Sequence, residues 1–276
     1  MMTAREIIRY MESLRNEEQR RVLMGFFKTA AGQYGYGDEF LGIKVPQTRE
    51  VVKMAAKDMP LSEIPGLLTC QWHEVRLCGL LILVWHFERM ATKRLINDTQ
   101  ATKQRDEMLS LYLQHAEQAN NWDLVDLSAP KILGHWLMLP TMLPEGKAGQ
   151  NKDYKLKVLD ELAASTCLWK QRMSMVCTWK TSQMGDASWC LRYAEIHLQH
   201  PHDLMHKAVG WMLREMGKRV SMDLLRDFLR QHVHEMPRTA LRYAIEKMDD
   251  DERQYWMSIT TDTTQQKPQR STTECE

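Results

Sequence analysis

The stretch WKQRM, residues 169–173, has two counterparts downstream: HKAVG at residues 206–210 and LRYAI at residues 241–245. Each places a basic residue just before an apolar run with helical spacing, and these basic positions, 172, 207 and 242, are 35 residues apart. A fixed period near this length is typical of stacked helix pairs, such as TPR (34 residues) and HEAT (roughly 40–47 residues) repeats. The sequence therefore predicts an all-α fold, an α-α superhelix of HEAT-like repeats whose concave side forms a groove.

The chain before these repeats also has helical patterning. Residues 3–28 carry apolar side chains at helical spacing and predict a helix pair broken near Asn16. Further helices are expected to begin at Val45-Pro46 and to cover residues 74–88 and 108–119, with an end or kink at Pro130. Asp126 lies 46 residues before Arg172, which resembles the repeat period once a short insertion is removed.

Three segments depart from this pattern. The glycine-rich residues 32–38 follow a helix rather than a strand, so we expect an ordered surface loop and not a phosphate-binding loop. Residues 140–152 contain two prolines and two glycines and are expected to form a surface insertion. Residues 258–276 are rich in Thr and Gln and predict a disordered tail behind a single domain of residues 1–257.

Composition excludes several classes of protein. No apolar run approaches the ~18 residues of a membrane span, and the N-terminus lacks an apolar signal-peptide core. The six cysteines form no C-x-x-C pair and suggest reduced thiols of a cytoplasmic protein. The ten histidines include no H-E-x-x-H motif, so we expect neither a metal nor another cofactor.

Charge is uneven along the chain although the net charge is only +1. Residues 165–245 hold twelve Lys and Arg against seven Asp and Glu, whereas residues 246–276 hold four against eight. A basic segment in a neutral chain suits a surface that binds a polyanion, which would make the groove basic. Chance unevenness is the alternative.

The stretch NNWDLVDLSAP, residues 120–130, is the first candidate for a functional site. Trp122 and Asp126 are four residues apart, so on a helix they share one face. A helix that only fills a core would place Leu or Val at both positions, whereas this one sets a large aromatic ring beside a carboxylate. The plainer alternative is a packed Trp and a solvated Asp. Asp123 lies about 60° away on the helical wheel, where we expect it to serve the helix N-terminus as a first-turn carboxylate.

A second candidate is a stripe of basic residues around a tryptophan. Its members are spaced as one face of a helix: Lys207, Trp211, Arg214 and Lys218. We expect this stripe to lie on the groove floor, where cations meet phosphates and the ring meets a sugar or a base. Arg172, Arg238 and Arg242 would extend the surface. Alternatively the ring packs and the basic stems snorkel past it.

These segments resemble those of the AlkD-like DNA alkylation repair family, whose members are DNA glycosylases built from HEAT-like repeats. The resemblance spans roughly residues 5–257, and it is most specific where W-D-x-V-D and G-W-x-L-R-E occur in this order. The matching stretches are FFKT (26–29), FLGIKVP (40–46), WDLVD (122–126), WKQR (169–172) and VGWMLRE (209–215). The glycine-rich loop, the insertion and the polar tail depart from the family pattern.

The resemblance implies residue roles and an activity. The family's catalytic aspartate falls on Asp126, its groove tryptophans on Trp122 and Trp211, and its phosphate-side arginine on Arg172. It implies hydrolysis of the N-glycosidic bond of cationic alkylpurines in duplex DNA, without drawing the lesion into a pocket. We expect a monomer whose partner is duplex DNA containing alkylated bases. A non-catalytic HEAT-repeat DNA-binding protein, or a solenoid that binds a protein, are the alternatives.

Overall fold

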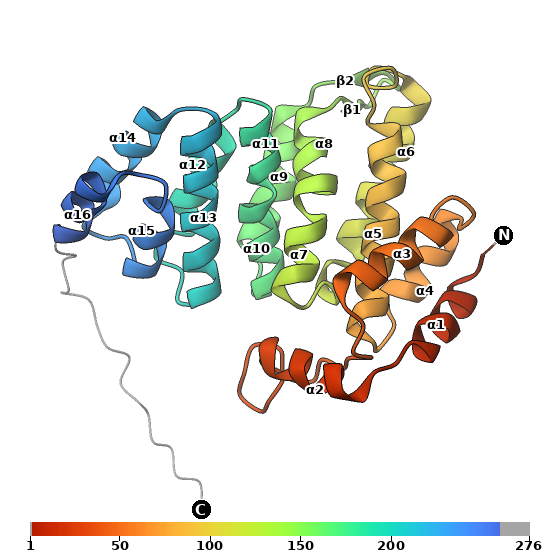
Figure 1. The fold of residues 1–276 in the computed structure, drawn as a ribbon. Helices are drawn as coiled ribbons and strands as arrows, with labels where there is room; N and C mark the ends of the chain where they lie inside the picture. Colours follow the sequence, from red (N-terminus) through yellow and green to blue (C-terminus); the bar gives the residue numbers. More distant parts are fainter. Residues whose placement is uncertain (1, 260–276) are drawn as a thin grey trace, which may run out of the picture.

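The computed structural model describes residues 2–259, and these form an all-α array with one small hairpin. In Figure 1 the helices from α5 to α16 stand side by side in a row, and α2 lies apart at the lower edge. The elements of the N-terminal half are α1 (Ala4–Ser13), α2 (Glu17–Phe26), α3 (Val45–Ala55), η1 (Leu61–Glu63), α4 (Ile64–Leu68), α5 (His73–Met90), α6 (Thr99–Gln114), η2 (Ala116–Gln118), α7 (Trp122–Ser128), η3 (Pro130–Gly134) and α8 (His135–Met138). Those that follow are β1 (Thr141–Met142), β2 (Ala148–Gly149), α9 (Lys152–Ala163), α10 (Leu168–Val176), α11 (Thr178–Gln183), α12 (Ser188–Ile196), α13 (Asp203–Arg219), α14 (Met222–His232), α15 (Arg238–Ala244) and α16 (Asp250–Ser258). The all-α prediction is confirmed for the described part of the chain.

Polar side chains set where many of these helices begin. A Ser, Thr, Asn or Asp before the first turn accepts a hydrogen bond from a backbone N–H that the helix leaves unpaired. Such caps are Thr3, Asn16, Asp98, Asn121, Asn151, Ser221 and Asp249. The predicted break of the first helix pair near Asn16 is therefore confirmed, because Asn16 caps α2.

The repeat of 35 residues corresponds to three neighbouring helices of the superhelix. Arg172 lies on α10, Lys207 on α13 and Arg242 on α15, and α13 packs against both of the others. Gly210 permits the close packing of α13 on α15, since a Cβ atom there would lie 2.2 Å from the carbonyl oxygen of Ala240. The sequence period thus marks helices that lie next to one another in space.

The centre of the array is α5, which is buried on nearly every side. Its residues from His73 to Val84 are all buried, so this helix has no solvent face over its first three turns. It packs against α3, α4, α6 and α7. A helix that is buried on all sides belongs inside a core, and the packing of α5 sets the position of α7 relative to the N-terminal helices.

The chain changes its helical winding after α7. Pro130 stands at the start of the five-residue π-turn η3, and α8 continues from it. Proline cannot donate the helical hydrogen bond, so a wider turn at this point has a direct chemical cause. The predicted end or kink at Pro130 is confirmed, because α7 ends at Ser128 and the π-turn begins at Pro130.

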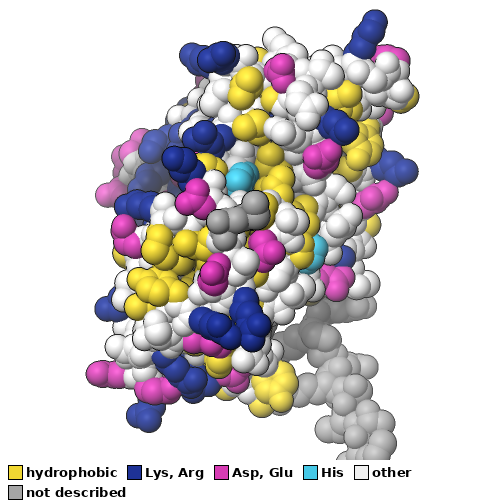
Figure 2. Space-filling model, turned by 90° about the vertical axis from the view of Figure 1, so that its right-hand side faces the viewer, with side chains coloured by type: hydrophobic (Ala, Val, Ile, Leu, Met, Phe, Trp, Pro, Cys, Tyr) yellow, Lys and Arg dark blue, Asp and Glu magenta, His cyan; other side chains and the backbone are white. Residues whose placement is uncertain are grey.

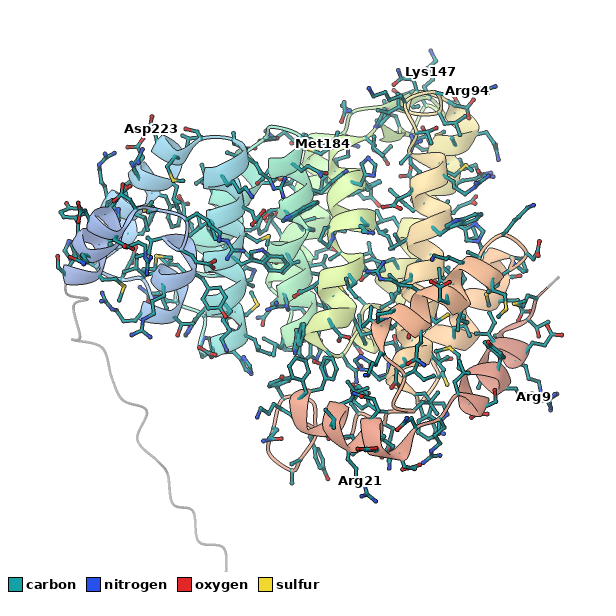
Figure 3. All side chains as sticks on the ribbon, in the orientation of Figure 1. Arg9, Arg21, Arg94, Lys147, Met184 and Asp223 are labelled. Atoms are coloured by element: carbon teal, nitrogen blue, oxygen red, sulfur yellow. The ribbon has the colours of Figure 1, made fainter. Side chains whose placement is uncertain are left out.

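The expected insertion at residues 140–152 forms the hairpin of β1 and β2, which pair antiparallel. The ammonium of Lys155 is buried at the base of this hairpin, where it donates hydrogen bonds to the carbonyl oxygens of Leu137 and Leu139. Burial lowers the pKa of Lys155 to about 8. Figure 3 places Lys147, in the turn of this hairpin, at the edge of the molecule opposite to Arg21 of α2.

The outer surface at the N-terminal end is of mixed character. Figure 2 shows basic and acidic side chains interspersed there, with small groups of exposed hydrophobic side chains between them. Within residues 2–259, no helix has the length and apolarity needed to cross a membrane. Most of the predicted tail, residues 260–276, lies outside the described residues, and its first two residues, Ser258 and Ile259, close α16.

Candidate active site in the concave groove

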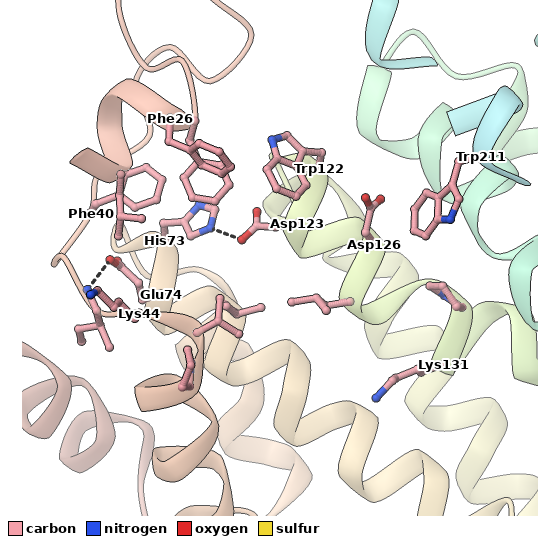
Figure 4. Close-up of a pocket in the computed structure, with 18 of the residues that line it drawn as sticks. Phe26, Phe40, Lys44, His73, Glu74, Trp122, Asp123, Asp126, Lys131 and Trp211 are labelled. Atoms are coloured by element: carbon pink, nitrogen blue, oxygen red, sulfur yellow. Dashed lines mark hydrogen bonds and ion pairs between the residues drawn. The ribbon is translucent and has the colours of Figure 1, made fainter. Parts of the chain in front are cut away.

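A cavity of about 790 Å³ lies where α2, the start of α5, α7 and α13 face one another. Most of its lining is apolar or aromatic, and the ionisable groups in it are His73, Glu74, Asp123, Asp126, Lys44 and Lys131. Its size falls within the range of roughly 300–1,000 Å³ that is typical of small-molecule pockets. Figure 4 shows the Asp126 carboxylate pointing up between the rings of Trp122 and Trp211.

Trp122 stands at the first position of α7 and is half-buried against two phenylalanines of the α2 region. Its ring centroid lies 5.2 Å from that of Phe27 and 5.7 Å from that of Phe26. Phe27 is buried, whereas Phe26 is 59% exposed. Phe26, Phe27 and Trp122 thus form an aromatic wall in which Phe27 is buried and Phe26 is exposed. This wall holds Trp122 at the mouth of the cavity.

Asp126 lies one turn after Trp122 and forms a bidentate ion pair with Arg172 of α10. Arg172 donates from Nε to Oδ1 and from Nη2 to Oδ2, each at 2.9 Å, and from Nη1 to the carbonyl oxygen of Leu204 at 2.6 Å. Burial raises the pKa of Asp126, Arg172 opposes this rise, and the neighbouring Asp123 adds to it. Arg172, a buried cation, therefore fixes the orientation of the Asp126 carboxylate.

His73, the first residue of α5, binds two carboxylates in the wall of the same cavity. Its Nδ1 lies 2.7 Å from Oδ2 of Asp38, and its Nε2 lies 3.0 Å from Oδ2 of Asp123. Burial alone would lower the pKa of His73, but the two carboxylates outweigh it and raise the pKa to about 9. Arg76, one turn later on α5, pairs with the other oxygen of Asp38. A buried imidazolium thus joins the loop of Asp38 to the first turn of α7.

The segment FLGIKVP is folded around a buried carboxylate of α5. Glu74 accepts hydrogen bonds from the backbone N–H groups of Leu41, Gly42 and Ile43, at 2.8–3.0 Å. Gly42 has φ +86°, and a Cβ atom there would lie 2.1 Å from the carbonyl oxygen of Asn16. This position therefore requires glycine. The segment forms part of the apolar edge of the cavity.

The comparisons with known proteins agree with this geometry. Residues 7–248 match the family described as DNA alkylation repair enzyme. The chain belongs to that family. Its fold is similar to a solved structure titled a predicted DNA alkylation repair enzyme from Enterococcus faecalis, with a TM-score of 0.59 and 14% identity, over 86% of this chain and 97% of that one. No curated protein gives a significant match. The likeness confirms the predicted fold, an all-α superhelix of HEAT-like repeats.

The structure brings together four of the residues expected in the site: Trp122, Asp126, Arg172 and Trp211. Arg172 takes part differently from the expectation, because it is only 5% exposed and its guanidinium is occupied by Asp126 and Leu204. Three of its five N–H donors are engaged within the protein. Its direct binding to DNA stays a prediction.

The other expected cations lie on α13 and α15. Lys207 pairs with Asp203 at 2.8 Å, and Arg214 pairs with Glu246 and Glu215, whereas Lys218 and Arg242 are exposed. Arg238 donates to the carbonyl oxygens of Met257 and Ile259 at the end of the described chain. Lys207, Trp211, Arg214 and Lys218 do share the outward stripe of α13, since Ala208, Met212 and Leu213 fill its buried side.

Sequence reasoning missed three parts of this site. It gave no role to Asp38, which the glycine-rich loop delivers to His73, or to His73 itself. It assigned Asp123 to the helix terminus, whereas this residue is buried and paired with His73. It also expected no pocket. The only signal was the position of Asp38 just before the FLGIKVP stretch. His73 lies beside none of the matching stretches, and pairing across 35 residues is not visible in a sequence.

Proposed function

We propose that this protein is a DNA glycosylase of base excision repair. It would hydrolyse the N-glycosidic bond of cationic alkylated purines, such as 3-methyladenine and 7-methylguanine, in duplex DNA. The observation that carries the proposal is the Asp126 carboxylate, held by Arg172 and pointing between Trp122 and Trp211 at the cavity. Membership of the DNA alkylation repair enzyme family supports DNA as the substrate.

The chemistry needs few groups because the substrate supplies its own leaving group. Alkylation at N3 or N7 makes the purine cationic, so the base departs as a neutral molecule without a general acid. Positive charge then develops on the deoxyribose, and a fixed carboxylate in an apolar cavity stabilises it strongly. The faces of Trp122 and Trp211 add to this effect, because aromatic faces attract cations.

The environment of Asp126 suits such a role. Arg172 holds both carboxylate oxygens in one orientation, so no reorganisation is needed when the charge on the sugar appears. The same arginine favours the ionised form and so opposes the burial that raises the pKa of Asp126. Apolar lining residues such as Leu127 and Leu23 limit the water that would screen the field.

Release of methylated base from alkylated duplex DNA tests the proposal. The purified protein should liberate 3-methyladenine or 7-methylguanine and leave abasic sites, detected by chromatography of the free bases. A protein that binds this DNA with steep salt dependence but releases no base would instead be a non-catalytic DNA-binding member of the family. Affinity for DNA that does not fall with salt would favour a protein-binding solenoid.

A further inference from the structure

The side of α7 that faces the cavity continues beyond Asp126 into the π-turn η3. The lining residues of this segment occur as adjacent pairs four positions apart: Trp122 and Asp123, Asp126 and Leu127, and Pro130 and Lys131. A step of four residues drifts by about 40° around an α-helix, which has 3.6 residues per turn. The π-turn is wider and reduces this drift, and the N–H of Gly134 closes it on the carbonyl oxygen of Ala129 at 2.9 Å. The turn therefore keeps Lys131 on the cavity side.

Lys131 is held loosely, unlike the carboxylates of the cavity. Its ion pair with Glu88 of α5 spans 3.7 Å, and the two side chains are 41% and 50% exposed. This distance is too long for a good hydrogen bond, and an exposed pair of this kind contributes little to stability. Figure 4 shows Lys131 below Asp126 on the same run of chain, with its amine pointing away from that ribbon. The ammonium is therefore available to bind another anion.

A second lysine lies close to this pair. Burial lowers the pKa of Lys180 on α11, Glu88 opposes this effect and Lys131 adds to it. The π-turn packs directly on α11, since a Cβ atom on Gly134 would lie 2.9 Å from the Cβ atom of Lys180. Two lysines thus lie beside Glu88, and these three groups carry a net positive charge at the end of the cavity that Lys131 lines.

We propose that Lys131 binds a phosphate of the lesion strand next to the deoxyribose held at Asp126. The inference rests on the proposed glycosylase function and adds a DNA contact outside the α13 stripe. Asp126 and Lys131 are about 7 Å apart along the helix axis, so the carboxylate can face the sugar while the longer lysine reaches a phosphate attached to it. The cation also offsets the repulsion between Asp126 and that phosphate. Contacts of this kind fix the register of the strand on the protein.

Binding of Lys131→Gln to a duplex with one tetrahydrofuran abasic analogue, which cannot be hydrolysed, tests the proposal. Affinity should fall by roughly tenfold, as for the loss of a charged hydrogen bond. The slope of log Kd against log salt should decrease by about 0.9. The rate of base release at saturating protein should stay near that of the wild type, because the phosphate is bound equally before and during the reaction. Lys131→Arg should retain most of the affinity.

A neutral methylphosphonate in the DNA locates the contact. In the wild type, replacing one of the two phosphates that flank the analogue should weaken binding about as much as Lys131→Gln does. The same replacement should cost Lys131→Gln nothing further, because the two changes remove one interaction. Penalties that add at both flanking phosphates would overturn the proposal.

Lys157→Gln is the matched control, since Lys157 pairs with Glu161 on α9 at 4.0 Å and does not line the cavity. It should keep the affinity and the salt slope of the wild type. The same result for Lys131→Gln would remove Lys131 from the DNA contact. A wild-type protein that binds the duplex but releases no base would overturn the glycosylase function alone, since the phosphate contact is judged from binding. A wild-type protein that binds no duplex would overturn both.

Discussion

Arg172 binds both oxygens of Asp126, 46 residues away in the chain, with two hydrogen bonds of 2.9 Å. The guanidinium is buried and its third partner is the carbonyl oxygen of Leu204. The arginine that the sequence assigned to the phosphate side thus stands behind the carboxylate. The orientation and the charge of Asp126 therefore depend on how α7 packs against α10.

Asp126→Asn should abolish most base release while DNA binding holds or improves. The change keeps the shape of the side chain but removes the negative charge that would face the sugar, and with it a repulsion toward phosphate. Release should fall by orders of magnitude in single-turnover assays on methylated duplex DNA, with affinity followed by fluorescence anisotropy. Asp227→Asn, at an exposed carboxylate of α14, should behave as the wild type. Excision by Asp126→Asn at the wild-type rate would remove Asp126 from the chemistry.

Lys207→Gln combined with Lys218→Gln should weaken binding to duplexes of any sequence. Both lysines lie on the outward stripe of α13, and removing one cation from a phosphate should flatten the dependence of log Kd on log salt by roughly 0.9. Titrations from low to high salt give this slope. Arg172 is unsuited to the test, because its replacement would also release Asp126.

The matched control for this pair is Arg94→Gln with Lys147→Gln, which also removes two positive charges. Figure 3 places both residues at the edge of the molecule that carries the hairpin, far from Arg21 of α2. Their replacement should leave the salt slope unchanged. An equal effect of the two double variants would show that net charge, and not the α13 stripe, governs binding.

The sequence was informative about the fold because the repeat is periodic. Basic positions 35 residues apart marked α10, α13 and α15, and the cap at Asn16 and the kink at Pro130 were visible locally. The hairpin at residues 141–149 was not predicted, since two-residue strands carry too little alternation to detect. Residues 108–119 were expected to be one helix, but α6 ends at Gln114.

The site was predictable where its residues share one helix and unpredictable where they meet across the fold. The spacing of Trp122 and Asp126 places them together, and the stripe of α13 follows from the same rule. The pairing of His73 with Asp38 and Asp123 depends instead on how α5 packs against the loop and α7. The sequence favoured a helix-terminus role for Asp123, which local reasoning cannot distinguish from a buried ion pair.

The stability of the protein should fall between pH 6.5 and about 9 through His73. Its pKa is raised in the folded state, so the stabilisation is complete below 6.5 and is lost as the pH rises to about 9. One proton accounts for roughly 1.4 kcal/mol per pH unit in that window. Urea unfolding at several pH values should show this decline in the wild type and not in His73→Gln. Parallel curves for the two proteins would contradict the charged state of His73.

Replacement of the neighbours Phe26 and Phe27 by alanine should affect different properties. Phe27→Ala should lower stability, whereas Phe26→Ala should lower affinity for DNA. Phe27 is 6% exposed and stacks on Phe40 at 5.2 Å, so Phe27→Ala should cost about 3–5 kcal/mol of unfolding free energy. Phe26 is 59% exposed at the mouth of the cavity, so Phe26→Ala should leave the melting temperature almost unchanged. If the groove binds DNA, removing this ring should weaken affinity by about tenfold, because stacking of a base on an aromatic ring contributes ~1–3 kcal/mol.

Calorimetry of both variants and anisotropy with an alkylated duplex separate these two effects. Phe26→Trp supplies the control, because it keeps a stacking face beside Trp122 and should retain most of the affinity. If Phe26→Ala binds as well as the wild type, the exposed ring of α2 does not touch the duplex. The DNA would then lie on the α7 and α13 side of the groove, with Trp122 as its last aromatic neighbour toward α2.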